Sequence, residues 1–442
     1  MPDGTRRIYT LLKMNYDETL EWLYRQLPMF SRTGAAAYKP GLQTSEDLDA
    51  AFGHPHRKFR SIHIGGTNGK GSTSHMIAAM LQSQGYKTGL YTSPHLVDFR
   101  ERIRVDGEMI PKEAVTNFVE RFRKSGYEGH PSFFELTMMM AFDWFARCSV
   151  DYAVIEVGMG GRLDSTNIIT PELAVITNIS KDHTQFLGKT LPEIAREKAG
   201  IIKPGVPTVV GEADGEVREV FEERGSETGT TVLFAEDMHP LQSCEPAPEG
   251  GFICKSPVAG GVFTCSLGGE YQKKNINTVL AALTEMRRIG IDISDESVRK
   301  GLSQVSELTG LAGRWMKTGD NPLTICDTGH NEAGLGYTMR QLEVTAARLG
   351  GRKHIVIGFV ADKAIDDIIG LLPADAEYYI TQAAIPRALP AEQLAEKLRL
   401  NGLGGEVYPT PKDAAAAARR KAEKNDVVYI GGSTFVVADY LE

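Results

Sequence analysis

The stretch Ile64-Gly65-Gly66-Thr67-Asn68-Gly69-Lys70-Gly71-Ser72-Thr73 determines the fold of the first half of the chain. It departs from the common phosphate-binding pattern G-x-x-x-x-G-K-[ST], because Ile64 replaces a glycine and Gly71 directly follows the lysine. The physical parts are nevertheless present, since four glycines let backbone N–H groups approach an anion and the lysine adds a positive charge. Residues 60–64 predict a strand before the loop, and residues 73–81 predict a helix whose N-terminus favours phosphate. The stretch therefore predicts a nucleotide-triphosphate site rather than a glycine-rich turn with a chance lysine.

The rest of the first half alternates strands with helices, which is the signature of a parallel sheet covered on both faces. The apolar runs that predict further strands are 88–92, 151–157 and 173–179. Helices are expected over 134–145 and 272–288, and the run Met138–Met140 favours a core position over a cofactor pocket. Residues 231–267 carry short β-like runs and predict a small antiparallel patch.

A second alternating series predicts a smaller, Rossmann-like α/β domain at the C-terminus. Its strand candidates are 323–326, 354–357, 377–380 and 427–430. We expect the boundary near residues 306–313, which divides the chain into a first domain of residues 1–308 and a second of residues 309–442.

Composition narrows the classes of protein to which the chain can belong. Its 442 residues exceed one ordinary core, and 42% hydrophobic with 24% charged residues is typical of a globular protein in water. A net charge of −8 argues against nucleic-acid binding, and no apolar run is long enough to span a membrane. The five scattered cysteines are expected to be reduced thiols, and the N-terminus lacks the apolar core of a signal peptide. We therefore expect a cytoplasmic protein.

Polar residues follow several predicted strands, at the edge where open parallel sheets bind ligands. Besides Lys70, they are Ser93, Glu156 and His183. Glu156 resembles the acid that ends a Walker B strand and reaches Mg²⁺, the alternative being an acid paired with a neighbouring base. For His183 a structural role and a role as a metal ligand both stay open, because Mg²⁺ prefers oxygen.

Three further features indicate ligand binding. Residues 158–167 combine glycines, charges and hydroxyls just after a strand, which favours a ligand-binding loop over a solvent-exposed turn. The segment Asp327-Thr328-Gly329-His330-Asn331 again places an acid and an imidazole at the end of a strand. Arg314 lies on the linker, where it either contacts a phosphate when the domains close or is a plain surface arginine.

Taken together, these motifs resemble the folylpolyglutamate synthase and dihydrofolate synthase family, relatives of the Mur ligases. The segments that carry the resemblance are 27–30, 66–72, 91–96, 101–103, 156–167, 182–183, 198–203, 271–275, 313–314, 327–331 and 361–363. The loop Gly-Thr-Asn-Gly-Lys-Gly-Ser belongs to the wider Mur superfamily. The segments Tyr-Thr-Ser-Pro-His and Gly-Gly-Arg-Leu-Asp-Ser-Thr-Asn point to the folate branch. Tyr271, Trp315, Thr328 and Gly329 depart from the residues usual in the family without removing a functional side chain.

The resemblance implies a Mur-ligase-type P-loop ATPase domain followed by a glutamate-ligase domain, and it assigns roles to individual residues. The implied ATP-binding residues are Thr67, Asn68, Gly69, Lys70, Gly71, Ser72, Thr73, Asn275, Arg314 and Asp327. The implied Mg²⁺ ligands are Ser93, Glu156, His183 and, once carbamylated, Lys198. The implied catalytic residues are Lys70, Lys198 and His330. The residues implied for the folate or pterin loop are Phe134, Arg162 and Asp164.

The implied activity is ATP-dependent ligation of L-glutamate to a folate or folylpolyglutamate. The loop over 158–167 looks like that of bifunctional bacterial enzymes, which also act on dihydropteroate. ATP and two Mg²⁺ ions are implied, the acceptor carboxylate passing through an acyl phosphate. A monomer without nucleic-acid or membrane partners is expected.

Two other functions are weighed against this one. A Mur-type ligase acting on a UDP-linked peptide precursor would not need the segment over 91–96 or the loop over 160–167. A slowly hydrolysing nucleotide switch would not need the metal-site acids or the second domain with Asp327 and His330.

Overall fold

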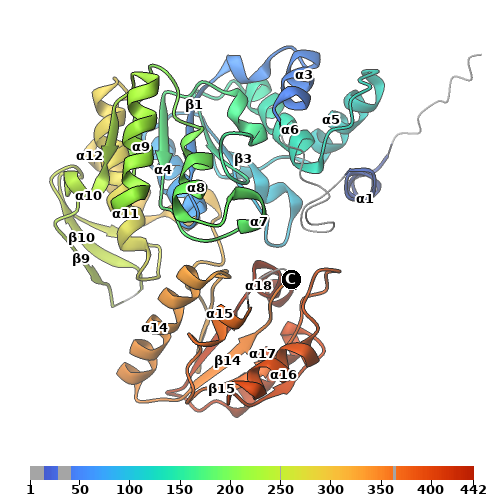
Figure 1. Cartoon of the computed structure of the whole chain (residues 1–442), viewed down its shortest axis with the longest axis vertical. Coiled ribbons are helices and arrows are strands. Elements are labelled where there is room, and N and C mark those ends of the chain that lie inside the picture. The colour runs from blue at the N-terminus through green and yellow to red at the C-terminus, as the bar shows by residue number, and fades with distance from the viewer. Residues whose placement is uncertain (1–13, 28–40, 249, 362–364) are drawn as a thin grey trace, which may run out of the picture.

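Two large sheets organise the chain, one in each half of Figure 1, which is viewed with the longest axis vertical. The computed structural model describes residues 14–27, 41–248, 250–361 and 365–442. The sequence motifs at 27–30 and 361–363 therefore lie partly outside the described residues.

The first sheet has eight strands in the order β4-β3-β2-β5-β1-β6-β7-β8. The six strands β2, β5, β1, β6, β7 and β8 run parallel to one another, whereas β3 and β4 add an antiparallel edge beside β2. The strands are β1 (Arg60–Gly65), β2 (Thr88–Tyr91), β3 (Ile103–Val105), β4 (Glu108–Met109), β5 (Tyr152–Glu156), β6 (Leu173–Ile176), β7 (Thr208–Val210) and β8 (Val232–Phe234). The predicted parallel sheet is confirmed, although β2, β5 and β6 each end before the limit that the apolar runs gave.

Helices cover both faces of this sheet, which explains why the central strands β1, β5 and β6 are buried along almost their whole length. On β5, Val154 packs into the core beside α4 and α11, while Ile155 packs into the core beside α6. The helices of this domain are α1 (Tyr16–Gln26), α3 (Gln43–Ala51), α4 (Lys70–Gln84), α5 (Lys112–Lys124), α6 (Phe133–Cys148), α7 (Thr184–Leu187), α8 (Leu191–Ala199), α9 (Gly215–Thr228), α10 (Ala235–Met238), α11 (Gln272–Arg288), α12 (Asp295–Ser303) and α13 (Val305–Thr309). Short 3-10 helices cover Pro55–Lys58, Phe99–Arg102 and Ser165–Ile168.

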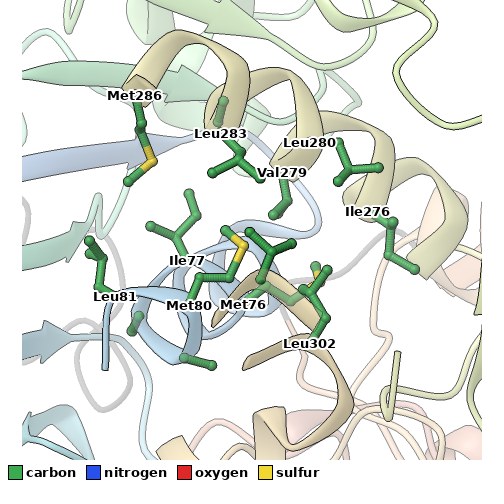
Figure 2. Close-up of a cluster of buried hydrophobic side chains, with 14 of the residues drawn as sticks. Met76, Ile77, Met80, Leu81, Ile276, Val279, Leu280, Leu283, Met286 and Leu302 are labelled. Atoms are coloured by element: carbon green, nitrogen blue, oxygen red, sulfur yellow. The ribbon is translucent and has the colours of Figure 1, made fainter. Parts of the chain in front are cut away.

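Figure 2 shows the core behind the phosphate-binding loop, where the apolar side chains of α4 and α11 face each other. The labelled side chains are Met76, Ile77, Met80 and Leu81 of α4, Ile276, Val279, Leu280, Leu283 and Met286 of α11, and Leu302 of α12. Helix α4 begins at Lys70 rather than at residue 73, so the loop passes directly into the helix. Residues 72–81 are all buried, as expected of a helix enclosed on every side. The loop is thereby attached to one of the most enclosed helices of the fold.

The antiparallel patch over 231–267 is confirmed but is smaller than predicted. It consists of β9 (Ser243–Pro246), β10 (Phe252–Ser256) and β11 (Gly261–Cys265), in the order β11-β10-β9. Strand β8, which lies within the predicted range, instead extends the large sheet beside β7. A run of three residues has too few alternations to show which sheet it joins.

The second sheet has six strands in the order β12-β13-β17-β14-β15-β16 and is parallel except for β12. Its strands are β12 (Met316–Asp320), β13 (Leu323–Cys326), β14 (Lys353–Ile357), β15 (Glu377–Ile380), β16 (Gly405–Val407) and β17 (Val427–Gly431). Its helices are α14 (Glu332–Leu349), α15 (Ile365–Ile369), α16 (Ala391–Leu400), α17 (Pro411–Lys421) and α18 (Thr434–Leu441). All four predicted strands are present, and the strands not foreseen, β12 and β16, are polar edge strands. The division between residues 308 and 309, which falls at the end of α13, stays a proposal.

Three sequence expectations, about the cysteines, the methionine run and membrane-spanning helices, can be compared with the structure. All five cysteines are free thiols, as their spacing indicated. Met138, Met139 and Met140 are buried in the core of the first domain. Across the described residues, no helix combines the length and apolar character needed to cross a bilayer.

Candidate functional site

A cleft of about 550 Å³ lies where the carboxyl ends of strands from both sheets meet. Gly66 and Ser93 follow β1 and β2, Glu156 ends β5, and all three line the cleft. Asp327 follows β13 of the second sheet and lines the opposite wall. The rule that open parallel sheets bind ligands beyond their carboxyl ends therefore locates this site.

The phosphate-binding loop is braced by the segment that follows β6. The backbone N–H of Thr67 donates to the carbonyl of Asn178 at 2.9 Å, and that of Asn68 donates to Asn178 Oδ1 at 3.1 Å. The Thr177 hydroxyl donates to the carbonyl of Asn68 at 2.6 Å. Gly66 has φ +131°, and a side chain there would meet Thr177, so only glycine fits. The backbone of the loop is thus fixed in advance of any anion.

The loop residues that were predicted to bind ATP, Thr67 to Ser72, all line the cleft. Lys70 Nζ donates to the Thr67 carbonyl at 3.0 Å, so the lysine folds over its own loop. Thr73 is buried outside the cleft lining, and its hydroxyl has no hydrogen-bond partner among the described residues. Asn275 of α11 also lines the cleft, and its amide lies where a side chain at residue 69 would extend.

Glu156 is buried at the base of the cleft. Its Oε2 accepts the backbone N–H of Ser93 at 3.2 Å. Burial raises the pKa of Glu156, against the opposing effects of Lys70, the Ser93 N–H and Arg314. His183 lines the same cleft just before α7, and its Nε2 lies 3.9 Å from Asp182 Oδ1. The structure therefore brings the three predicted Mg²⁺ ligands to one cleft.

Lys198 reaches the loop from α8. The side chain is almost fully buried, and its Nζ donates to the Gly66 carbonyl at 2.8 Å. Burial, with the nearby Lys70 charge, lowers the pKa of Lys198 to about 7, although Asp182 and Asp164 act in the opposite direction. An amine with such a pKa is partly neutral at physiological pH and therefore nucleophilic.

Asp327 is the most enclosed polar residue that the second domain contributes to the cleft. Its Oδ1 accepts the Gly329 N–H at 2.7 Å, and its Oδ2 accepts the Trp315 N–H at 2.7 Å and the Tyr271 hydroxyl at 2.6 Å. Burial raises the pKa of Asp327, and these hydrogen bonds, led by that of Tyr271, oppose the rise. Arg314, on the linker, lines the cleft and hydrogen-bonds to the Thr328 hydroxyl.

A polar group of side chains joins the two domains beside the phosphate-binding loop. His330 Nε2 lies 3.4 Å from Asp182 Oδ2, and its Nδ1 lies 3.0 Å from the Thr328 carbonyl. Asn331 Nδ2 donates to Asn68 Oδ1 at 2.9 Å and to Asp182 Oδ2 at 3.2 Å. His330 is thereby held at the cleft, next to the loop residue Asn68.

The three residues predicted for the folate or pterin loop do not line this cleft. Arg162 Nη2 forms an ion pair with Glu197 Oε1 at 2.7 Å on the outer side of the loop. Asp164 is buried, and its oxygens accept the N–H groups of Met159 at 2.8 Å and Thr166 at 3.0 Å. Phe134 packs beneath the loop instead, where a side chain at residue 158 would meet its ring. From the loop, the cleft lining includes Gly158, Met159 and Gly160.

Several cleft residues carried no assignment from the sequence. Among the residues that line the cleft, those that the sequence left without a role include Asp182, Glu212, Tyr271, Lys274 and Tyr337. Glu212 follows β7, so the rule used for Glu156 would have found it, but β7 is only three residues long. Lys274 pairs with Glu212, and its Nζ lies 5.6 Å from the centroid of the Tyr337 ring. These contacts join α11, the end of β7 and α14. Because the three segments are far apart in the sequence, no local sequence pattern predicts the contacts.

Comparison with known proteins agrees with this geometry. The model of the Mur ligase middle domain matches residues 64–283, and that of the Mur ligase glutamate ligase domain matches residues 313–434. The chain is 32% identical to the Bacillus subtilis dihydrofolate synthase/folylpolyglutamate synthase over 96% of its own length and 98% of that protein. The chain belongs to the dihydrofolate synthase/folylpolyglutamate synthase family. It spans half the length of a Haloferax volcanii relative to which it is 33% identical.

Solved structures of this family share the fold over nearly the whole chain. Escherichia coli FolC in complex with DHPP and ADP matches with a TM-score of 0.83 and 28% identity, covering 97% of both chains. A bifunctional folylpolyglutamate synthase/dihydrofolate synthase with Mn, AMPPNP and L-glutamate bound matches with a TM-score of 0.79 and 28% identity, covering 96% of this chain and 98% of that one. Membership of the family therefore rests on sequence and on three-dimensional structure alike.

Proposed function

We propose that this protein is an ATP-dependent ligase that joins L-glutamate to folates and folylpolyglutamates, and to dihydropteroate. The observation that carries the proposal is the convergence of Lys70, Glu156 and Lys198 with Asp327 and His330 in one cleft between two domains. A nucleotide switch needs only the residues of the first domain, which hold the nucleotide. A ligase must hold a nucleotide, an acceptor and an amine together, which requires residues of both domains.

The proposed reaction has two chemical steps. The γ-phosphoryl group of ATP passes to the acceptor carboxylate, giving an acyl phosphate and ADP. The amine of glutamate then attacks the carbonyl carbon, phosphate leaves, and the amine loses a proton. Lys70 and the backbone N–H groups of the first turn of α4, residues 70–72, stabilise charge on the transferring group, because the loop and the helix already hold them in position.

The residues present fit a magnesium ion that is completed by the nucleotide. Glu156 supplies a buried carboxylate, and Ser93, whose N–H is bonded to it, supplies a hydroxyl. Within the described parts of the chain, no group of three histidine, cysteine or acidic side chains could hold a metal by itself. This suits Mg²⁺, which usually binds one or two carboxylates together with substrate phosphates rather than a complete protein cage. When bound, the ion neutralises phosphate charge.

Lys198 is the proposed site of carbamylation. Its neutral amine would add to CO₂ with loss of one proton, replacing a buried cation by an anion. Burial next to Lys70 favours this exchange, because a negative group there would compensate the lysine of the phosphate-binding loop. The carbamate oxygens would then serve a second Mg²⁺.

Closure of the domains completes the proposed mechanism. Arg314 and Asp327 face the phosphate-binding loop across the cleft, and exclusion of water would protect the acyl phosphate from hydrolysis. We also propose that the enzyme acts as a monomer in the cytoplasm, because its five thiols are free and both walls of the cleft come from one chain.

The test is release of ADP from Mg-ATP in the presence of L-glutamate. Dihydropteroate, a reduced folate and a UDP-muramyl substrate are added in turn, and we expect stimulation by the first two alone. Absence of stimulation by either pterin would refute the proposed function. Lys70→Ala should abolish the stimulated rate, whereas Lys58→Ala, in the short 3-10 helix before β1 and outside the cleft lining, serves as the matched control.

A further inference from the structure

The first turn of α11 contacts both walls of the cleft. Gln272 Nε2 donates to Ser72 Oγ of α4 at 3.0 Å, and Asn275 Nδ2 donates to Gln272 Oε1 at 2.7 Å. Tyr271, the residue before the helix, reaches the other wall, where its hydroxyl donates to Asp327 Oδ2 at 2.6 Å. One helical turn thus connects the helix of the phosphate-binding loop with the acid at the end of β13.

The position of the Tyr271 hydroxyl is fixed by contacts of its neighbours with the second domain. The backbone N–H of Glu270 donates to Gln341 Oε1 of α14 at 2.7 Å. The rings of Tyr271 and Tyr337 meet edge to face with centroids 6.5 Å apart. A side chain at Gly268 would lie 3.1 Å from the carbonyl oxygen of Trp315, so the turn into α11 passes close against the linker.

Among the described residues, Tyr271 is the only residue of the first domain that hydrogen-bonds to the Asp327 carboxylate. Its other two donors, the N–H groups of Trp315 and Gly329, lie on the linker and in the second domain itself. A buried carboxylate with three donors is held in one orientation, and removal of the Tyr271 hydroxyl leaves Oδ2 with the Trp315 N–H alone. The first domain can therefore set the orientation of Asp327 through the hydroxyl of Tyr271.

We propose that Tyr271 is a positioning residue for the nucleotide: its hydroxyl holds Asp327 in the orientation that binds ATP and links that orientation to the phosphate-binding loop through α11. This inference rests on the proposed function in one respect, that ATP is the ligand of the cleft. It assigns Tyr271 no contact with the reacting atoms.

A double-mutant cycle on ATP affinity tests the proposal. The dissociation constant of Mg-ATP is measured by titration calorimetry for the wild type, Tyr271→Phe, Asp327→Asn and the double variant. Tyr271→Phe removes one hydrogen bond to a charged group and should weaken binding on the order of tenfold. Because the hydroxyl acts through Asp327, the double variant should bind ATP no more weakly than Asp327→Asn alone.

Kinetics and control variants separate positioning from a general structural role. Tyr271→Phe should raise the KM for ATP and leave kcat unchanged, and Tyr271→His, which retains a donor, should recover part of the loss. Tyr378→Phe is the matched control, because that buried hydroxyl donates to the Pro373 carbonyl at 2.6 Å in the second domain, outside the cleft lining. It should leave ATP affinity unchanged.

Two results would overturn the proposal: an unchanged ATP affinity in Tyr271→Phe, or losses that add in the double variant. If Tyr271→Phe does not fold, the same cycle is run with Tyr271→His, for which additive losses refute it equally. Calorimetry needs no ligation, so a protein that shows the predicted cycle but is stimulated by neither pterin would contradict the proposed function and leave this inference intact.

Discussion

Replacement of the buried Lys198 by methionine should stabilise the protein at neutral pH and lose that advantage as the pH rises. The folded state lowers the pKa of Lys198 from 10.5 to about 7. One pKa unit corresponds to about 1.4 kcal/mol, so a protonated lysine at this position costs the folded state up to about 5 kcal/mol at pH 7 or below.

The sign follows from proton binding. Between pH 7 and 10.5 the unfolded chain holds more protons on this lysine than the folded chain does, so the stability of the wild type rises with pH in that window. The cost is about 4 kcal/mol at pH 7 and about 1 kcal/mol at pH 9.5, so the advantage of Lys198→Met should shrink by about 3 kcal/mol between these two values. The lost hydrogen bond to the Gly66 carbonyl lowers the advantage by about 1 kcal/mol at both values.

The assay is urea denaturation of both proteins at pH 7 and pH 9.5 in buffers free of CO₂. The exposed Lys189→Met is measured alongside to correct for the change of residue. An advantage that stays constant or grows with pH would show that the lysine is not held in a lowered-pKa environment. Addition of bicarbonate should then stabilise the wild type alone, because only the wild type can form the carbamate.

Three further changes have defined outcomes. Glu156→Gln removes the buried carboxylate of the proposed magnesium site and should raise the Mg²⁺ concentration needed for half-maximal ADP release at least tenfold; an unchanged requirement in a magnesium titration would place the ion elsewhere. Arg314→Ala should lower kcat about 10²-fold without changing the melting temperature, since it removes a cation that faces the nucleotide only across the cleft; unchanged turnover would contradict that role. Leu283→Ala leaves a cavity between α11 and α4 (Figure 2) and should reduce the free energy of unfolding by about 2–5 kcal/mol in urea denaturation, with ATP affinity retained if the fold persists.

The parts of the fold that periodicity predicts are those buried on both sides. Strands β5 and β6 are near-continuous apolar runs because helices cover each face of the sheet, so their positions can be read directly from the sequence. Strands β7 and β16 escape prediction because each has three residues, and the exposed residues of β16 carry no apolar signal. Sequence also indicates which side chains follow a strand, and for that reason Lys70, Ser93, Glu156 and Asp327 were placed at the cleft.

What sequence does not predict is the direction in which a loop side chain points. The family resemblance assigns Arg162 and Asp164 to the folate or pterin loop. In the structure the Asp164 carboxylate turns inward onto the N–H groups of its own loop, and Arg162 turns outward to Glu197. The partner of Arg162 lies on α8, and those of Asp164 lie within its own loop, so the preceding strand sets neither direction. The role of these two residues in folate binding stays a prediction.

The two departures of the phosphate-binding loop have separate physical causes. Ile64 is fully buried and belongs to β1, where it pairs with Glu156 of β5, so the strand occupies the position at which the common pattern already requires a glycine. Gly71 lies between the walls of the cleft, where a side chain would come within 3.6 Å of Arg314 Nη2 and 3.8 Å of Glu156 Oε2. Absence of a side chain at residue 71 leaves open the space in which we propose that phosphate and metal bind. The displaced hydroxyl, on Ser72, accepts a hydrogen bond from Gln272, and the serine that contacts the buried carboxylate is Ser93, through its backbone N–H. The unusual sequence of the loop is therefore that of a phosphate-binding loop that faces a second domain across the cleft.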